Sequence, residues 1–208
     1  MVPKKGEKIS GDSTVMCENT KGEFVAAISD AMGSGASAAK DSADALEILK
    51  NFMTAGMEPV TSVELINSAL LLRSSADKFV TMDMCVVNTR EGSLKLIKSG
   101  AAPGYIKTSR GVSVVKGSMV PYGVLENHDK ITTDVIGIGD SVMVVMVSDG
   151  LSEILHSEKG DALKAIVAST DTKNPQIMAS VLMKQGLKAC SDAPEDDMTV
   201  VVVAIQKA

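Results

Sequence analysis

Hydrophobic residues recur along the chain at two different spacings, and these separate predicted helices from predicted strands. Spacings of three and four residues predict helices, and they occur over Gly35–Thr54, Thr61–Asp77, Asp161–Ser169 and Asn174–Cys190. Alternating hydrophobic and polar positions, or short continuous hydrophobic runs, predict strands. They occur over Ser13–Cys17, Glu23–Ser29, Val80–Asn88, Ser93–Ser99, Tyr105–Thr108, Val112–Val115, Asp129–Val135, Val142–Ser148 and Thr199–Ile205.

The order of these elements favours two sheets covered by helices. A hairpin is followed by two helices, a series of strands, two further helices and a last strand. Two antiparallel sheets, each covered by a pair of helices, would bury the hydrophobic side of every element. No repeat or linker divides the chain, so we expect one domain over residues 1–208.

Composition and charge argue against several classes of function. Hydrophobic residues make up 45% of the chain, and the formal charge of −5 comes without a dense basic face, so nucleic acid is not an expected partner. The 3 cysteines are far apart, which indicates a reducing compartment and argues against a disulfide framework or structural zinc. With 2 histidines, the chain has little material for a His-rich metal site or a Ser-His-Asp triad. The hydrophobic runs at 141–148 and 198–205 are too short to span a bilayer.

Aspartates stand where the predicted hydrophobic strands begin or end. The set comprises Asp12 before a strand, Asp30 at the end of FVAAISD, Asp149 at the end of VMVVMVSD, and Asp196 and Asp197 before MTVVVVAI. If these strands are neighbours, the carboxylates converge and repel one another unless cations are bound. Oxygen ligands with few histidines suit Mg²⁺ or Mn²⁺, and two such ions roughly 3.5–4 Å apart can activate water for phosphoryl transfer. Each aspartate taken alone is also compatible with an ordinary turn, so both interpretations stay open at this point.

A glycine loop, GSGASA at 33–38, follows Asp30 and has the spacing of a dinucleotide-binding turn. That interpretation also needs an acidic residue about twenty positions further on, at the end of a second strand. Glu47 comes too early and lies within a predicted helix. We therefore expect Gly33 and Gly35 to turn the chain sharply from the Asp30 strand into the following helix.

Taken together, the motifs resemble a known family. The motifs are GDS at Gly11–Ser13, SDAMGSG at Ser29–Gly35, SGAAPGYIK at Ser99–Lys107, PYGV at Pro121–Val124, SDG at Ser148–Gly150 and EDDMTVVVV at Glu195–Val203. Their order is similar to that of the bacterial PP2C-like (PPM) metal-dependent serine/threonine phosphatases, and most closely to the phosphatase domain of the stage II sporulation protein E branch. The resemblance covers nearly the whole chain. It implies an α+β fold, a four-layer α-β-β-α sandwich of two antiparallel sheets flanked by antiparallel helix pairs, with two Mn²⁺ or Mg²⁺ ions between the sheet edges.

The resemblance also implies roles for individual residues. The catalytic metal ligands would be Asp12, Asp30, Asp149 and Asp196, joined by the backbone carbonyl of Ala31. Asp197 stands where many members have Asn, and it would support the ligands without binding metal. A metal-activated water would attack phosphorus directly. The family usually has Gly at the position of Ala31, and a positive φ there would cost an alanine on the order of 1 kcal/mol.

By the same resemblance, the protein would hydrolyse phosphoserine or phosphothreonine in a phosphorylated anti-anti-sigma-factor-type regulator of sporulation or stress signalling. A catalytically silent phosphatase-like binding or sensor module is the alternative, and a hydrolase of small phosphorylated molecules is a third hypothesis. We expect a cytoplasmic fragment of a longer protein, with no membrane contact by this segment and any membrane tether in a region outside it. A homodimer is a further partner that the sequence leaves open.

Two other acidic positions carry expectations of their own. Asp83 lies among hydrophobic residues in TMDM, and we expect it to have a hydrogen-bonded structural role. Glu153 and His156 follow the SDG motif, and we expect them in an exposed loop.

Overall fold

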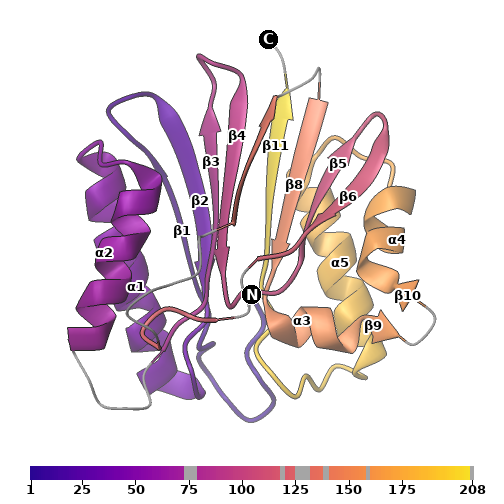
Figure 1. The fold of residues 1–208 in the computed structure, drawn as a ribbon. Coiled ribbons are helices and arrows are strands. Elements are labelled where there is room, and N and C mark those ends of the chain that lie inside the picture. The colour runs from indigo at the N-terminus through magenta and orange to yellow at the C-terminus, as the bar shows by residue number, and fades with distance from the viewer. Residues whose placement is uncertain (73–78, 118–119, 125–131, 138–140, 158–159, 207–208) are drawn as a thin grey trace.

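The computed structural model describes the chain except for residues 73–78, 118–119, 125–131, 138–140, 158–159 and 207–208. Two antiparallel sheets lie face to face, with helices on the outer side of each (Figure 1). The predicted four-layer α-β-β-α arrangement is therefore confirmed.

The first sheet contains five strands in the order β1-β2-β3-β4-β7. Their bounds are β1 Ser13–Glu18, β2 Glu23–Ser29, β3 Met82–Asn88, β4 Ser93–Ser99 and β7 Thr132–Gly137. Every neighbouring pair in this sheet is antiparallel. Its first four strands therefore form a meander, interrupted between β2 and β3 by two helices.

The second sheet contains four strands in the order β11-β8-β5-β6, again with every neighbouring pair antiparallel. Their bounds are β5 Gly104–Thr108, β6 Gly111–Val115, β8 Ser141–Val147 and β11 Val200–Gln206. A separate two-stranded ladder joins β9 (His156–Ser157) to β10 (Gly160–Asp161). The final strand of the chain thus pairs with β8, which comes long before it in sequence.

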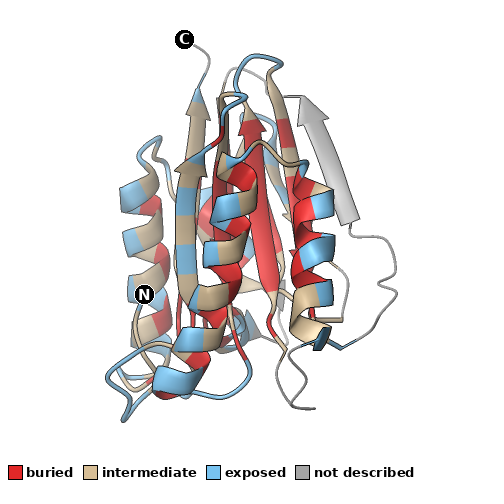
Figure 2. Cartoon of the chain, turned by 90° about the vertical axis from the view of Figure 1, so that its left-hand side faces the viewer, coloured by how far each residue is buried: buried red, intermediate tan, exposed pale blue. Residues whose placement is uncertain are grey.

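Helices cover the outer face of each sheet. Helices α1 (Gly35–Thr54) and α2 (Pro59–Leu72) lie on the first sheet, and α4 (Ala162–Ser169) and α5 (Pro175–Ala189) lie on the second (Figure 1). The side view shows buried residues on the sheet side of the first helix pair and exposed residues on its outer side (Figure 2). A short helix, α3 (Asp149–Ile154), follows β8 directly.

Three hydrophobic clusters fill the spaces between the four layers. Successive residues of β2 point to different clusters: Val25 and Ala27 pack under α1 and α2, whereas Ala26 and Ile28 pack between the sheets. The third cluster lies between the second sheet and its helices and includes Val145 of β8. Both faces of the central strands are therefore buried, which explains why these strands appear in the sequence as continuous hydrophobic runs.

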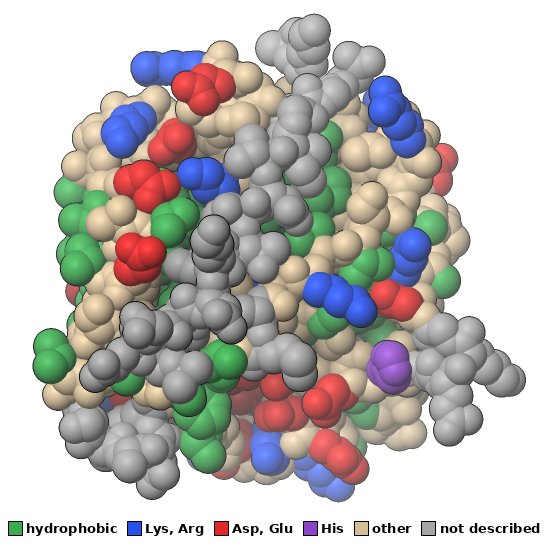
Figure 3. Space-filling view, viewed as in Figure 1, with side chains coloured by type: hydrophobic (Ala, Val, Ile, Leu, Met, Phe, Trp, Pro, Cys, Tyr) green, Lys and Arg blue, Asp and Glu red, His purple; other side chains and the backbone are tan. Residues whose placement is uncertain are grey.

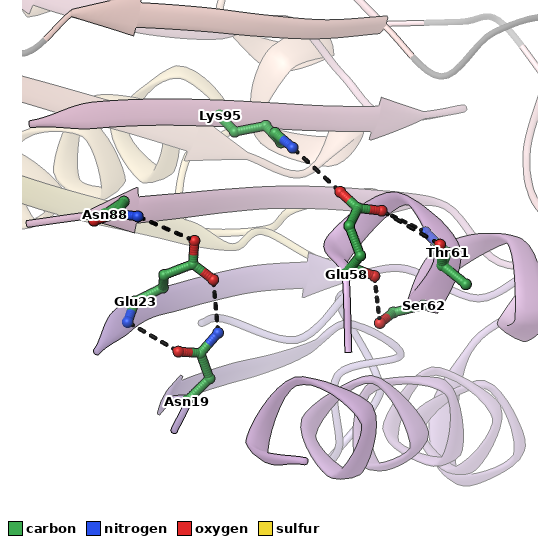
Figure 4. Close-up of polar contacts among 7 residues, drawn as sticks. All are labelled: Asn19, Glu23, Glu58, Thr61, Ser62, Asn88 and Lys95. Atoms are coloured by element: carbon green, nitrogen blue, oxygen red, sulfur yellow. Dashed lines mark hydrogen bonds and ion pairs between the residues drawn. The ribbon is translucent and has the colours of Figure 1, made fainter. Parts of the chain in front are cut away.

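The start of α2 is fixed by Glu58 (Figure 4). Its carboxylate accepts a hydrogen bond from the Thr61 backbone N–H at 2.9 Å. The same carboxylate forms an ion pair with the Lys95 amine of β4 at 3.2 Å. Its carbonyl accepts a hydrogen bond from the Ser62 hydroxyl at 2.9 Å. The sequence prediction that α2 begins at Thr61 was two residues late, because Pro59 is suited to the first helical turn and Glu58 supplies the capping oxygens.

The other predicted elements agree with the structure to within a few residues, with one clear exception. Glu153 was expected in a loop, but it lies in α3, while His156 begins β9. The predicted end of the second helix at Asp77 and the predicted start of a strand at Asp129 lie outside the described residues. Among the described helices, none combines the length and hydrophobicity needed to cross a membrane.

Candidate metal centre

Strand register brings four of the predicted aspartates to one end of the sandwich. In the β1–β2 hairpin Ser13 lies opposite Ser29, so Asp12 and Asp30 leave the first sheet side by side. In the second sheet Val147 lies opposite Val200. Asp149 and Asp196, which flank that pair, therefore leave the second sheet at a common end.

The pKa values show that these four carboxylates are electrostatic neighbours. The pKa of Asp30 is raised to about 8, first by burial and then by the nearby Asp12, Asp149 and Asp196. Burial also raises the pKa of Asp12 to about 6, opposed by the Thr199 and Ser148 hydroxyls. The pKa of Asp149 is raised by burial and then by Asp196. Such a cluster attracts a cation, because a bound cation removes the mutual repulsion.

The backbone next to Asp12 is held from both sides. Asp197 is buried, and its carboxylate accepts hydrogen bonds from the backbone N–H groups of Gly11 at 2.6 Å and Lys4 at 2.7 Å. The Gly11 carbonyl accepts a hydrogen bond from the Ser42 hydroxyl of α1 at 2.6 Å. Asp197 therefore positions the segment that carries Asp12, and an asparagine would offer only one of the two acceptor oxygens that this geometry uses.

Thr81 holds the backbone of Asp30. The Asp30 carbonyl accepts from the Thr81 N–H at 2.7 Å, and the Asp30 N–H donates to the Thr81 hydroxyl at 3.2 Å. Past Asp30, Gly33 and Gly35 have φ values of +105° and +69°, as expected for the sharp turn into α1.

Ala31 does not carry the backbone strain considered from the sequence. Among the described residues, the only non-glycine positions with positive φ are Ser191 and Asp192. Ala31 is buried and forms a bridge with Val80. Its backbone conformation is open to an L-amino acid, so replacing the family's usual Gly brings no φ penalty here.

Asp149 is positioned by close packing at the start of α3. The Ser148 hydroxyl donates to the Asp197 carbonyl at 3.1 Å and accepts from the Thr199 N–H at 2.9 Å. A Cβ on Gly150 would overlap the Asp197 carbonyl and lie 3.1 Å from the Asp196 Cβ. The glycine of the SDG motif thus lets α3 approach the loop that carries Asp196.

The oxygen ligands present are of the type that a hard divalent cation prefers, although the carboxylates are not arranged in a complete coordination sphere. Both carboxylate oxygens of Asp12 are buried, and neither accepts a hydrogen bond from a described residue. Within the described part of the chain, no three Asp, Glu, His or Cys side chains converge closely enough to hold an ion as they stand. The donor set is therefore suitable, but binding would require the carboxylates to rotate inward around the ion.

A groove of about 370 Å³ leads away from Asp149. The turn at 100–103 and Gly117 form part of its wall, and Lys116 is the one basic side chain among its described lining residues. On the face seen in Figure 3, acidic and basic side chains are intermixed at the lower end of the molecule, where α3 lies. The groove thus combines a carboxylate of the cluster with a single exposed cation.

Several supporting residues were not predicted from the sequence. Ser42 is a polar residue within the buried stripe of α1, and that position is the signal that could have identified it. Thr81 acts through its hydroxyl and its backbone N–H, and Gly150 through close backbone packing; both depend on tertiary contacts that residue type alone does not reveal. Asp83, by contrast, has the predicted hydrogen-bonded role, with Lys98 as its partner.

Known proteins are similar to this chain in sequence and in fold. A family model described as stage II sporulation protein E (SpoIIE) matches residues 20–206. Stage II sporulation protein E of Bacillus subtilis (strain 168) is 34% identical over 205 residues, which are 97% of this chain and 24% of that protein. The chain therefore spans about a quarter of the length of this curated relative.

Solved structures share the fold. The PP2C phosphatase domain of SpoIIE from Bacillus subtilis, solved with a fragment of its regulatory domain, matches with a TM-score of 0.89 and 32% identity. That match covers 98% of this chain and 61% of the solved one. RsbX in complex with magnesium matches with a TM-score of 0.74 over 98% of this chain and 90% of the solved one, at 17% identity, and shows similarity of fold alone.

Proposed function

Because the chain belongs to the stage II sporulation protein E family and has the PP2C fold, we propose that residues 1–208 form one metal-dependent serine/threonine phosphatase domain. The observation that carries the proposal is the gathering of four aspartates from two sheets. Their proximity and burial raise the pKa of Asp30 to about 8. Bound cations would compensate the repulsion among these carboxylates, and such clusters of perturbed pKa values are typical of functional sites.

In this proposal the aspartates hold two Mn²⁺ or Mg²⁺ ions. Asp12 and Asp30 approach the ions from the first sheet, together with the Ala31 carbonyl, and Asp149 and Asp196 approach them from the second. Bound divalent ions would lower the pKa of water and neutralise phosphate charge. Asp197 holds the Asp12 segment in place through Gly11, and the Thr81 contacts fix the direction of Asp30.

We propose a phosphoprotein as the substrate, of the anti-anti-sigma-factor type that family membership suggests. The groove beside Asp149 is open and has a volume of about 370 Å³, more than a phosphate group alone would fill. Lys116 at its edge would attract the phosphate or a neighbouring acidic residue. A small phosphorylated molecule would use less of this groove, so a preference for phosphoprotein over free phosphoserine is expected.

Release of phosphate from an aryl phosphate tests the proposal. We expect turnover that requires Mn²⁺ or Mg²⁺ and falls at least a hundredfold in Asp30→Asn and Asp149→Asn, on the order reported for loss of a principal electrostatic group. Asp171→Asn is the matched control, because Asp171 is exposed and lies outside the cluster. Metal-independent turnover, or full activity in both cluster variants, would contradict the proposed mechanism.

A second candidate is a phosphatase-like binding module without turnover. It is favoured by one observation, the absence of a finished three-ligand cage among the described side chains. Calorimetric titration with Mn²⁺ separates the two candidates. Binding with turnover supports the phosphatase, whereas a folded protein that neither binds Mn²⁺ nor releases phosphate supports the module.

A further inference from the structure

A buried ion pair lies between the sheets, close to the aspartate cluster but separate from it. Lys98 of β4 stands directly opposite Asp83 of β3, and its amine donates to Asp83 Oδ2. Both residues are 2% exposed. A pair buried this deeply adds little net stability as a rule, since desolvation offsets most of the attraction, so its presence calls for another explanation.

Two glycines make room for Lys98. A Cβ on Gly117 would overlap the Lys98 Cβ, and a Cβ on Gly104, at the start of β5, would lie 3.3 Å from the Lys98 amine. The lysine therefore reaches from the first sheet to the backbone of the second. Its charge is held at a fixed position by packing on both sides.

Asp83 also borders a small chamber under the aspartate cluster. The chamber has a volume of about 10 Å³, and its polar wall includes Asp30, Thr81, Asp83, Ser148 and Asp149. That volume is about the minimum that holds one water molecule. Asp83 Oδ1 is buried and accepts no hydrogen bond from any described residue. A buried carboxylate oxygen of this kind normally has a donor.

We infer that the chamber binds a single ordered water, which donates one hydrogen bond to Asp83 Oδ1 and the other to the carboxylate of Asp30 or Asp149. A water has two hydrogens to donate, so it can join two carboxyl oxygens that both accept hydrogen bonds. Burial raises the pKa of Asp83, and the Lys98 amine opposes that rise while it occupies Oδ2, which leaves Oδ1 as the remaining acceptor. Asp83 is thereby a positioning residue. Through the water it holds the inner side of one cluster carboxylate, that of Asp30 or of Asp149, and leaves the outer oxygen of that carboxylate for metal.

A crystal structure of the metal-free protein tests the water directly. We expect a density peak roughly 2.7 Å from Asp83 Oδ1 and within hydrogen-bond distance of Asp30 or Asp149. An empty chamber, or an Asp83 oxygen turned toward a protein donor, would overturn the inference. This measurement does not depend on the proposed function.

The positioning role rests on the proposed function, and a double variant tests it. Lys98→Met alone would leave Asp83 unpaired, whereas Asp83→Leu with Lys98→Met removes both charges and the acceptor oxygens at similar volume and should leave the fold intact. We expect the double variant to keep its melting temperature within a few degrees but to bind Mn²⁺ about tenfold more weakly in calorimetry, as for other residues that orient metal ligands.

The partly exposed pair between Lys95 of β4 and Glu58, which precedes α2, supplies the control, as Glu58→Gln with Lys95→Met. That variant should bind Mn²⁺ as the wild type does. Unchanged Mn²⁺ affinity in the buried double variant would overturn the positioning role. If the wild type itself binds no Mn²⁺, the phosphatase proposal fails, and the crystal structure alone decides whether the water site exists.

Discussion

Asp30 is the residue at which electrostatic repulsion is most concentrated. Its side chain is surrounded by Asp12, Asp149 and Asp196, and its pKa of about 8 lies far above the ordinary value of 3.8. In the folded, metal-free protein Asp30 therefore holds a proton at pH values where the unfolded chain has lost it. Protonation of Asp30 and the binding of a cation are two ways of relieving the same repulsion.

This linkage predicts how the stability of the metal-free protein depends on pH. A carboxyl whose folded pKa is raised favours the folded state at low pH, and that contribution is lost as the pH rises from about 4 to about 8. We expect the free energy of unfolding in EDTA to be higher at about pH 5 than at about pH 8. Asp30→Asn should raise stability at the higher pH and remove most of this slope.

Urea unfolding at the two pH values measures the effect. Asp171→Asn should retain the wild-type slope, since its exposed carboxylate has no cluster around it. A wild-type protein that gains stability as the pH rises through this range would show that the repulsion is absent. Saturating Mn²⁺ should reverse the trend in the wild type but not in Asp30→Asn.

At the scale of elements, α3 carries Asp149 and packs against the loop of Asp196, so it contacts both proposed metal ligands of the second sheet. Its first turn contains Asp149, and Gly150 packs directly on Asp196 and Asp197. A small shift of this helix would move carboxylates on both loops. The short helix therefore has a larger effect on the geometry of the cluster than its length suggests.

Gly150→Ala tests this coupling. The added Cβ would overlap the Asp197 carbonyl, so α3 or the loop must move. Overpacking of this kind costs typically about 1–3 kcal/mol, and we expect that loss in urea unfolding together with a tenfold or greater loss of Mn²⁺ affinity. Glu153→Ala, at an exposed position of the same helix, should leave both unchanged. Wild-type affinity in Gly150→Ala would show that the contact does not position the ligands.

Elements with a long periodic pattern were predictable from the sequence, and α3 was not. The strands that pack on two faces have continuous hydrophobic runs, and α1 has a buried stripe from Ala38 to Met53. Helix α3 has six residues, too few to establish a period, and it follows β8 without a break. The same limit applies to the β9–β10 ladder, because each of its strands has only two residues.

The candidate site was predictable as a set of residues but not as a mechanism of positioning. Aspartates at strand ends were identified because residue type and strand boundary are both visible in sequence. The cross-strand pairing of Asp83 with Lys98 depends on register between β3 and β4, which no local pattern specifies. The contacts of Asp197 depend on a segment almost two hundred positions away.

At the scale of the whole molecule, the net charge of −5 opposes the approach of a phosphorylated substrate. Divalent ions in the cluster would reverse that sign locally, and Lys116 adds a fixed positive charge beside the groove. The position of this lysine, rather than the overall charge, is expected to determine affinity for an anionic peptide.

Lys116→Glu tests this local effect. We expect the KM for a phosphopeptide to rise about tenfold, equivalent to about 1.4 kcal/mol, with little change in kcat or in Mn²⁺ affinity. Lys173→Glu makes the same change of charge at an exposed site outside the groove and should leave the KM nearly unchanged. An equal rise in both variants would assign the effect to net charge, and a fall in kcat alone would place Lys116 in the chemistry.

The contacts between Asp197 and the start of the chain have a consequence for biosynthesis. Gly11 and Lys4 are separated from Asp197 by 186 and 193 positions. Before the ribosome has translated residue 149, the β1–β2 hairpin can form, but the Asp12 segment lacks its two contacts with Asp197, and two of the four carboxylates have not been made. The proposed metal centre would therefore be assembled only when β11 has left the exit tunnel, so a nascent or prematurely terminated chain would lack the proposed phosphatase activity.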